Sequence, residues 1–201
     1  MIKSPHRISG LDAQPQALVA FVRNAAEPDA DAVNHRALRE QVAPLADWVE
    51  VDISTAPTSQ RQSWLRRELS SALGRKHMHL GQLVMLGWHD TARIALDLIL
   101  KGAITCAGIV AVDVPCTLPR DPIAATAASI RIVRHDSEMG GLEAGLIDAL
   151  RQQDADIRLM NLPAGGTHAR DVTTRAAATF LSELTAKACR QSSASKGSSH
   201  V

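Results

Sequence analysis

The fold of this chain is decided by residues 82–102, which read QLVMLGWHDTARIALDLILKG. The first five residues, QLVML, form a short apolar run of strand length. The last twelve, TARIALDLILKG at 91–102, repeat apolar residues at the spacing of one helical face. Only the letters GWHD separate the two patterns. The stretch therefore predicts a buried strand that turns sharply and continues directly as a helix.

Strand and helix patterns alternate on both sides of this unit. Apolar runs of strand length lie at 16–22, 48–53, 107–112, 129–133 and 157–162. Helical spacing is found at 33–46, 59–73, 139–153 and 171–189. Strands that are apolar throughout and are joined by helices are typical of a parallel sheet covered on both faces. We therefore expect an α/β fold with a mostly parallel central sheet and helices on both faces.

Length and composition indicate one domain. A chain of 201 residues with 45% hydrophobic content can bury one sizeable core. The strand and helix patterns place that domain at 16–189, after an N-terminal extension at 1–15. The tail at 190–201, QSSASKGSSHV after Arg190, is poor in apolar residues, so we expect it to be disordered.

Charge and hydropathy exclude several kinds of partner. Lys and Arg total 22 against 21 Asp and Glu, so the chain lacks the basic field that nucleic acid attracts. No window approaches the roughly 18 apolar residues of a membrane span, and the first residues lack the apolar stretch of a signal peptide. We expect a cytoplasmic protein that does not bind nucleic acid and has no membrane span.

The three cysteines and the histidines suggest no cofactor. Cys106, Cys116 and Cys189 are odd in number and widely spaced, which fits neither a disulfide framework nor a zinc site. We expect them to be reduced thiols. His77 and His79 alternate and could present two metal ligands, but no third ligand lies near them, so a solvated turn is the better interpretation.

The deciding stretch resembles a segment of a known enzyme family. LGWHDTARIALDLILKG at 86–102 is similar to the nucleophile-elbow segment of bacterial carboxylesterases, lysophospholipase-like enzymes and acyl-protein thioesterases, whose usual form is LGFSQGG followed by an Ala- and Leu-rich helix. ITCAGIVAVDVP at 104–115 resembles their next strand and loop, and a looser likeness extends from 16 to 184. The resemblance implies an α/β-hydrolase whose triad follows the order nucleophile, acid, histidine.

This resemblance implies three site residues. His89 stands at the place of the nucleophilic serine. His168, in AGGTHARD, matches the general base that takes the proton of the nucleophile and returns it to the leaving group. Asp136 or Glu138, in VRHDSE, would orient that imidazole, and Asp136 is preferred.

The departures from the family pattern bear on function. The chemistry requires a hydroxyl or thiol where His89 stands, Thr91 replaces the second glycine of the elbow, and the first strand ends in RNAA where the family has an HGxG-like oxyanion loop. These changes favour a protein that keeps the architecture and acts by binding, with a small acyl ester or a second copy of the chain as possible partners. The alternative is an active hydrolase of a small ester or thioester that uses His168 with a non-standard nucleophile.

Other chemistry remains open at three residues. His89 could itself be a nucleophile or base oriented by Asp90 or Asp136. Asp90 could be the nucleophile, as aspartate is in related dehalogenases, but this would put Trp88 where a small residue belongs. Cys116 could be a displaced thiol nucleophile, although structural use of a cysteine is commoner.

Two further residues have both a structural and a functional interpretation. His135, beside Asp136, is either a family remnant or half of a surface charge pair. Trp88 either anchors packing, which is the default, or lines a pocket at the elbow.

Overall fold

A computed structural model describes residues 17–26, 34–115, 122–135, 141–163, 165 and 168–197. Six strands form a single sheet in the order β2-β1-β3-β4-β5-β6, and every neighbouring pair is parallel. The strands are β1 (Ala17–Arg23), β2 (Ala46–Asp52), β3 (Leu83–Trp88), β4 (Gly108–Val112), β5 (Ser129–His135) and β6 (Ile157–Leu162). The expected parallel α/β sheet is confirmed.

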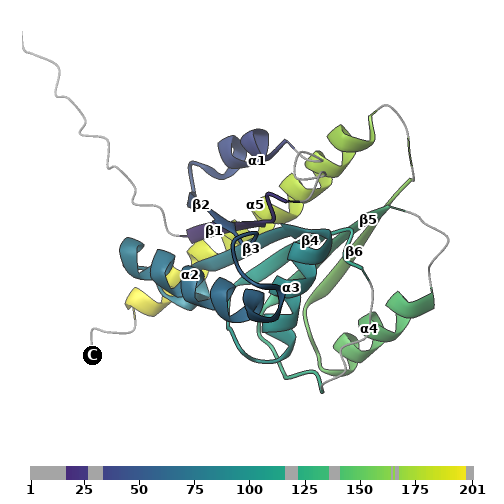
Figure 1. Cartoon of the computed structure of the whole chain (residues 1–201). Coiled ribbons are helices and arrows are strands. Elements are labelled where there is room, and N and C mark those ends of the chain that lie inside the picture. The colour runs from purple at the N-terminus through teal and green to yellow at the C-terminus, as the bar shows by residue number, and fades with distance from the viewer. Residues whose placement is uncertain are drawn as a thin grey trace, which may run out of the picture.

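Helices cover both faces of the sheet, as expected. They are α1 (His35–Val42), α2 (Arg61–Lys76), α3 (His89–Leu100), α4 (Gly141–Gln152) and α5 (Ala169–Gly197), with short 3₁₀ turns η2 (Thr58–Gln60) and η3 (Leu80–Gln82). α1 and α5 lie on one face, and α2, α3 and α4 on the other (Figure 1). Because alternate strand residues point to opposite faces, β1 places Leu18 and Ala20 toward α2 and α3, and Val19 and Phe21 toward α1 and α5.

Two predicted helix ends differ from the observed ones. The helix expected over 33–46 ends at Val42, because Pro44 has no N–H to continue the helical hydrogen bonds, and Ala46 already begins β2. Composition predicted a disordered tail after Cys189, whereas α5 continues to Gly197. A helix that is already formed extends cheaply through Gln, Ser, Ala and Lys, and glycine is where such extension stops.

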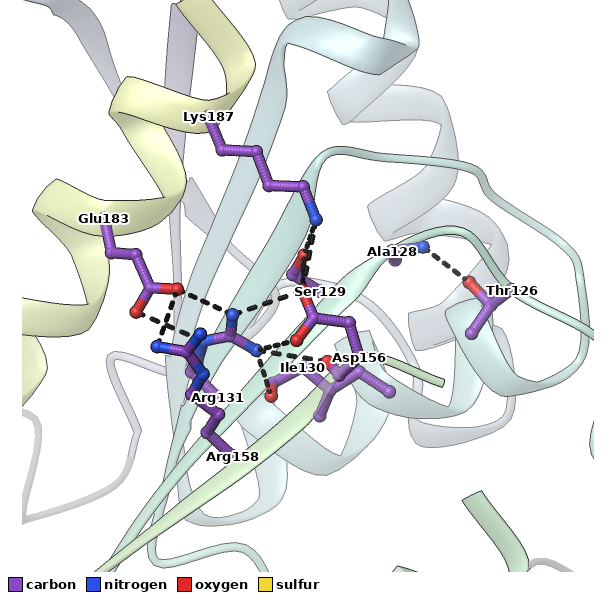
Figure 2. Close-up of polar contacts among 9 residues, drawn as sticks. All are labelled: Thr126, Ala128, Ser129, Ile130, Arg131, Asp156, Arg158, Glu183 and Lys187. Atoms are coloured by element: carbon purple, nitrogen blue, oxygen red, sulfur yellow. Dashed lines mark hydrogen bonds and ion pairs between the residues drawn. The ribbon is translucent and has the colours of Figure 1, made fainter. Parts of the chain in front are cut away.

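One buried charge ties the last helix to the edge of the sheet. Arg131 on β5 is only 1% exposed, and its guanidinium contacts Asp156 Oδ1 at 3.0 Å and Glu183 Oε1 at 2.7 Å (Figure 2). Lys187 on α5 reaches Asp156 Oδ2 at 3.1 Å and Ser129 Oγ at 2.5 Å. Burial opposes ionisation of Asp156, but the hydrogen bonds from Arg131, Ser129 and Lys187 hold its pKa well below the ordinary 3.8. The network therefore joins β5, the start of β6 and α5 through ionised groups.

Arg131→Ala is expected to lower the free energy of unfolding by about 3–5 kcal/mol, because it leaves Asp156 and Glu183 without their shared buried partner. Urea denaturation followed by circular dichroism measures this. Arg158→Ala is the matched control, since Arg158 also contacts Glu183 but is largely exposed, and it should cost less than about 1 kcal/mol. Equal losses in the two variants would contradict the central role of Arg131.

Candidate functional site

The junction between β3 and α3 has the form of a nucleophile elbow. β3 ends at Trp88 and α3 begins at His89 with no loop between them. His89 has a φ of 45°, in the left-handed region that side chains rarely adopt. A Cβ on Gly87 would lie 2.9 Å from the backbone of Ala92, so only glycine fits there. A strained residue on such a sharp strand-to-helix turn carries its side chain to the carboxyl edge of the sheet.

Thr91 braces this turn through its side chain. The hydroxyl accepts a hydrogen bond from the Trp88 backbone N–H at 3.0 Å and donates to the Trp88 carbonyl at 2.6 Å. Thr91 is 2% exposed, so these bonds are shielded from water. The residue that departs from the family pattern therefore holds the turn in place.

Trp88 is a packing residue, in agreement with the default interpretation. Its ring is 8% exposed and meets the Phe21 ring edge to face, with centroids 5.5 Å apart. Phe21 in turn lies 5.9 Å from the rings of His35 and Trp48. This aromatic group packs on the α1 and α5 side of the sheet, beneath the elbow.

The loop after β1 donates its N–H to a carboxylate. The Ala25 backbone N–H donates to Asp52 Oδ1 at 3.3 Å. Burial opposes ionisation of Asp52, but hydrogen bonds from Ser54 and Ala25 and the charge of Arg23 together hold its pKa below the ordinary value. Asp52 is therefore ionised at neutral pH. The N–H of the residue two positions after β1 is therefore engaged with a carboxylate.

A carboxylate, an imidazole and a hydroxyl form a chain at the ends of β4 and β5. Asp113, with a φ of 48°, follows β4, and its Oδ2 lies 2.9 Å from Nδ1 of His135, the last residue of β5. The His135 backbone N–H also donates to Asp113 Oδ1 at 3.0 Å. On the other side of the ring, Nε2 lies 2.9 Å from Oγ1 of Thr173 in α5. The order of groups is that of a hydrolytic triad.

The environment of Thr173 indicates that the hydrogen-bonded series Asp113–His135–Thr173 has a structural role. Thr173 is 3% exposed, and its hydroxyl donates its single proton to the Ala169 carbonyl at 2.7 Å. A nucleophile must reach a substrate, and this hydroxyl is enclosed. The series Asp113–His135–Thr173 therefore holds the start of α5 against the ends of β4 and β5.

The partner of His135 differs from the one considered in the sequence. Sequence adjacency suggested Asp136, which lies outside the described residues, whereas the structure pairs His135 with Asp113. Neither Asp113 nor Thr173 was found by sequence reasoning. The available signal was positional: Asp113 and His135 stand at the carboxyl ends of neighbouring parallel strands, which meet at one edge.

His168 and His135 line one small cavity, hereafter the His135–His168 cavity. It has a volume of about 210 Å³ and lies between the end of β6 and the start of α5. Its lining consists of His135, Leu162, Pro163, Gly165, His168, Ala169 and Val172. His89 is not part of this lining. Glu138, like Asp136 and Cys116, lies outside the described residues, so the structure does not place the acid expected for His168.

The remaining candidates carry no site in the described part of the chain. Burial raises the pKa of the Cys106 thiol to about 12, so this thiol is inert at neutral pH. His77 and His79 are both exposed, one ending α2 in a left-handed conformation and the other preceding η3. Across the described ranges, no group of three or more His, Cys, Asp or Glu side chains is placed to hold a metal ion. None of the described helices is both long and apolar enough to cross a bilayer.

Solved structures with this fold define its class. The chain has the α/β-hydrolase fold, with the strand order and elbow described above. It is similar to esterase PE8, with a TM-score of 0.66 and 15% identity over 85% of this chain and 93% of that one.

Two further similar structures are carboxylesterases. The Bacillus cereus carboxylesterase gives a TM-score of 0.61 and 15% identity, over 85% of this chain and 89% of that one. The phospholipase/carboxylesterase of Dyadobacter fermentans gives 0.60 and 11%, over 84% and 90%. No family model and no curated protein sequence matches the chain.

Gly87→Ala is expected to lower the free energy of unfolding by about 1–3 kcal/mol, because the new methyl group would force Ala92 and the start of α3 away from β3. Gly74→Ala is the matched control. Nothing lies within 4 Å of a Cβ at this helical position, so we expect a gain of about 0.5–1 kcal/mol. Thermal unfolding of both variants measures the difference, and a Gly87→Ala protein as stable as the wild type would show that the turn is not tightly packed.

Thr173→Val is expected to cost about 1–3 kcal/mol, because it leaves Nε2 of the partly buried His135 without a partner. Thr179→Val is the control. Thr179 makes the same bond to a carbonyl one turn back, but it is exposed, so we expect a change within about 0.5 kcal/mol. Hydrogen exchange in the first turn of α5 should accelerate in Thr173→Val alone, and unchanged exchange would argue against the structural role of the series Asp113–His135–Thr173.

Proposed function

We propose that this protein keeps the α/β-hydrolase architecture with His89 in place of the nucleophilic serine, and that it binds a small ligand at the carboxyl edge of its sheet without efficient ester cleavage. The observation that carries the proposal is the elbow itself. A residue at the start of α3 with a φ of 45°, behind a glycine at which a side chain would crowd Ala92, has the backbone geometry with which esterases present their nucleophile. In this chain that residue is His89, whose side chain is an imidazole.

The surroundings of His89 support a role other than nucleophile. An imidazole that attacks an acyl group needs a neighbour to fix its tautomer and stabilise its charge. Within the described part of the chain, no hydrogen bond or ion pair reaches the His89 ring. Asp90, the adjacent carboxylate, is exposed and does not orient it. His89 is thus a partly exposed imidazole that no described side chain orients.

The oxyanion loop also supports this view. Acyl transfer places a negative oxygen against two backbone N–H donors, and loss of one such donor lowers kcat by about 10²–10³. The Ala25 N–H after β1 faces ionised Asp52 instead. A carboxylate at this place repels the developing oxyanion in addition to occupying its donor.

A second candidate function rests on His168. An active hydrolase of small esters or thioesters would use His168 as its base, and this residue does line a cavity. The nucleophile and the acid of such an enzyme would then be non-standard. Within the described ranges, the one carboxylate hydrogen-bonded to an imidazole at this edge, Asp113, belongs to His135.

Hydrolysis of p-nitrophenyl acetate and butyrate tests the proposal. We expect the wild type to stay at the rate of buffer and His89→Ser to gain slow turnover, because the elbow geometry would then carry a hydroxyl. A fluorophosphonate should label His89→Ser and not the wild type. His79→Ser, which places a serine on an exposed turn, is the control and should gain neither activity nor label.

The opposite result is equally clear. Wild-type turnover that disappears in both His89→Ala and His168→Ala would establish a working enzyme and refute the proposal. Turnover gained in His89→Ser and lost again in His89→Ser/His168→Ala would support both the position of the elbow and the role of His168 as the remaining base.

A further inference from the structure

A second cavity lies beside the elbow, between α2 and α3, and we call it the Arg61–Arg93 cavity. Its volume is about 360 Å³, and it is lined by Thr58, Ser59, Arg61, Gln62, Asp90, Arg93, Ile94 and Asp97. α2 and α3 lie side by side on one face of the sheet (Figure 1). The lining comes from the segment after β2 and the first turns of α3, so the cavity opens at the carboxyl edge, where ligands bind in open α/β sheets. Asp90 places it directly next to His89.

The two arginines of this cavity lack counter-ions. Arg61 and Arg93 are both partly buried, and neither forms a hydrogen bond or ion pair through its side chain with any described residue. The Nε atom of Arg61 is buried without a partner. Burying part of a charge without compensation costs free energy. The chain compensates such charges elsewhere: Arg131 contacts two carboxylates, and Lys76 lies 2.9 Å from Asp47.

Carboxylates are present in the same lining but do not compensate these arginines. Asp90 and Asp97 both line the cavity, and among the described ion pairs neither is joined to Arg61 or Arg93. Asp97 accepts a hydrogen bond from Gln62 at 3.4 Å. The lining therefore brings together two guanidinium groups that have no ion pair with any described residue, the carboxylate of Asp90, and the hydroxyls of Thr58 and Ser59.

We propose that the Arg61–Arg93 cavity binds a small organic acid that carries a hydroxyl or amino group beside its carboxylate. This inference names the ligand of the proposed binding function and rests on it. The planar forks of two arginines suit one carboxylate, and a donor on the ligand would satisfy Asp90. Phosphate carries more negative charge and no such donor, so the two aspartates disfavour it. The volume is at the small end of the range for ligand sites and is ample for a small organic acid.

Titration followed by NMR of the arginine Nε–H groups tests this, with glycerate, acetate and inorganic phosphate as probes. We expect glycerate to shift the signals of Arg61 and Arg93 and to saturate with a Kd of about 1 mM, and acetate and phosphate to bind at least about fivefold more weakly. Arg61→Gln and Arg93→Gln should each weaken glycerate binding by about tenfold or more. Arg66→Gln, an exposed arginine on the same helix, is the control and should bind like the wild type.

A variant that changes only the proposed hydrogen-bond acceptor, Asp90, tests ligand recognition separately from the stability of the protein. Asp90→Asn should reduce the preference for glycerate over acetate while Arg61 and Arg93 still respond to both. Backbone amide spectra show whether each variant is folded. The proposal is wrong if glycerate causes no saturable shift by about 50 mM, which is too weak for a specific site, if phosphate binds as tightly as glycerate, or if both glutamine variants bind glycerate like the wild type.

The ester assay keeps this proposal distinct from the proposed function. A wild type that cleaves esters through His89 and His168 and still binds glycerate through Arg61 and Arg93 would refute the binding-only function and support the cavity. An inert wild type without glycerate binding would refute the cavity and leave the loss of ester cleavage standing.

Discussion

The close approach of α3 to the end of β3 is the constraint on which the other features of this structure depend. A side chain at Gly87 would crowd the backbone of Ala92. The hydroxyl of Thr91 stabilises the turn through hydrogen bonds with the N–H and the carbonyl of Trp88. This contact fixes where α3 starts and how it packs against β3 and β4. It therefore determines where His89 stands and how α3 meets α2 around the Arg61–Arg93 cavity.

Hydrogen bonding separates the polar groups of the molecule into two kinds. Neighbouring side chains form hydrogen bonds with Arg131, Asp113 and both ring nitrogens of His135. These hydrogen bonds join α5 to the strands. His89 and Arg61 have no such partners within the described residues. A polar group that remains partly buried and unpaired costs stability.

Much of the fold follows from the order of apolar patterns. The run at 157–162 corresponds to β6, and the strand, turn and helix predicted for 82–102 are β3 and α3. These patterns are reliable because each strand of a parallel sheet is buried on both faces and each helix on one. Helix ends were less well predicted, as at Val42 and Gly197, since they depend on single residues such as Pro44 and on the extension of a helix already formed.

The sequence by itself determined the parallel α/β class and the strand, turn and helix over 82–102 that carry His89, because these depend on apolar patterns among residues near one another in the chain. Only the tertiary structure decided that His135 contacts both Asp113 and Thr173, and that Arg61 and Arg93 line one cavity. Such pairings join residues that lie far apart in the chain. They depend on strand register and on the helix contacts that follow from it. The spacing of residues along the sequence predicts neither of these.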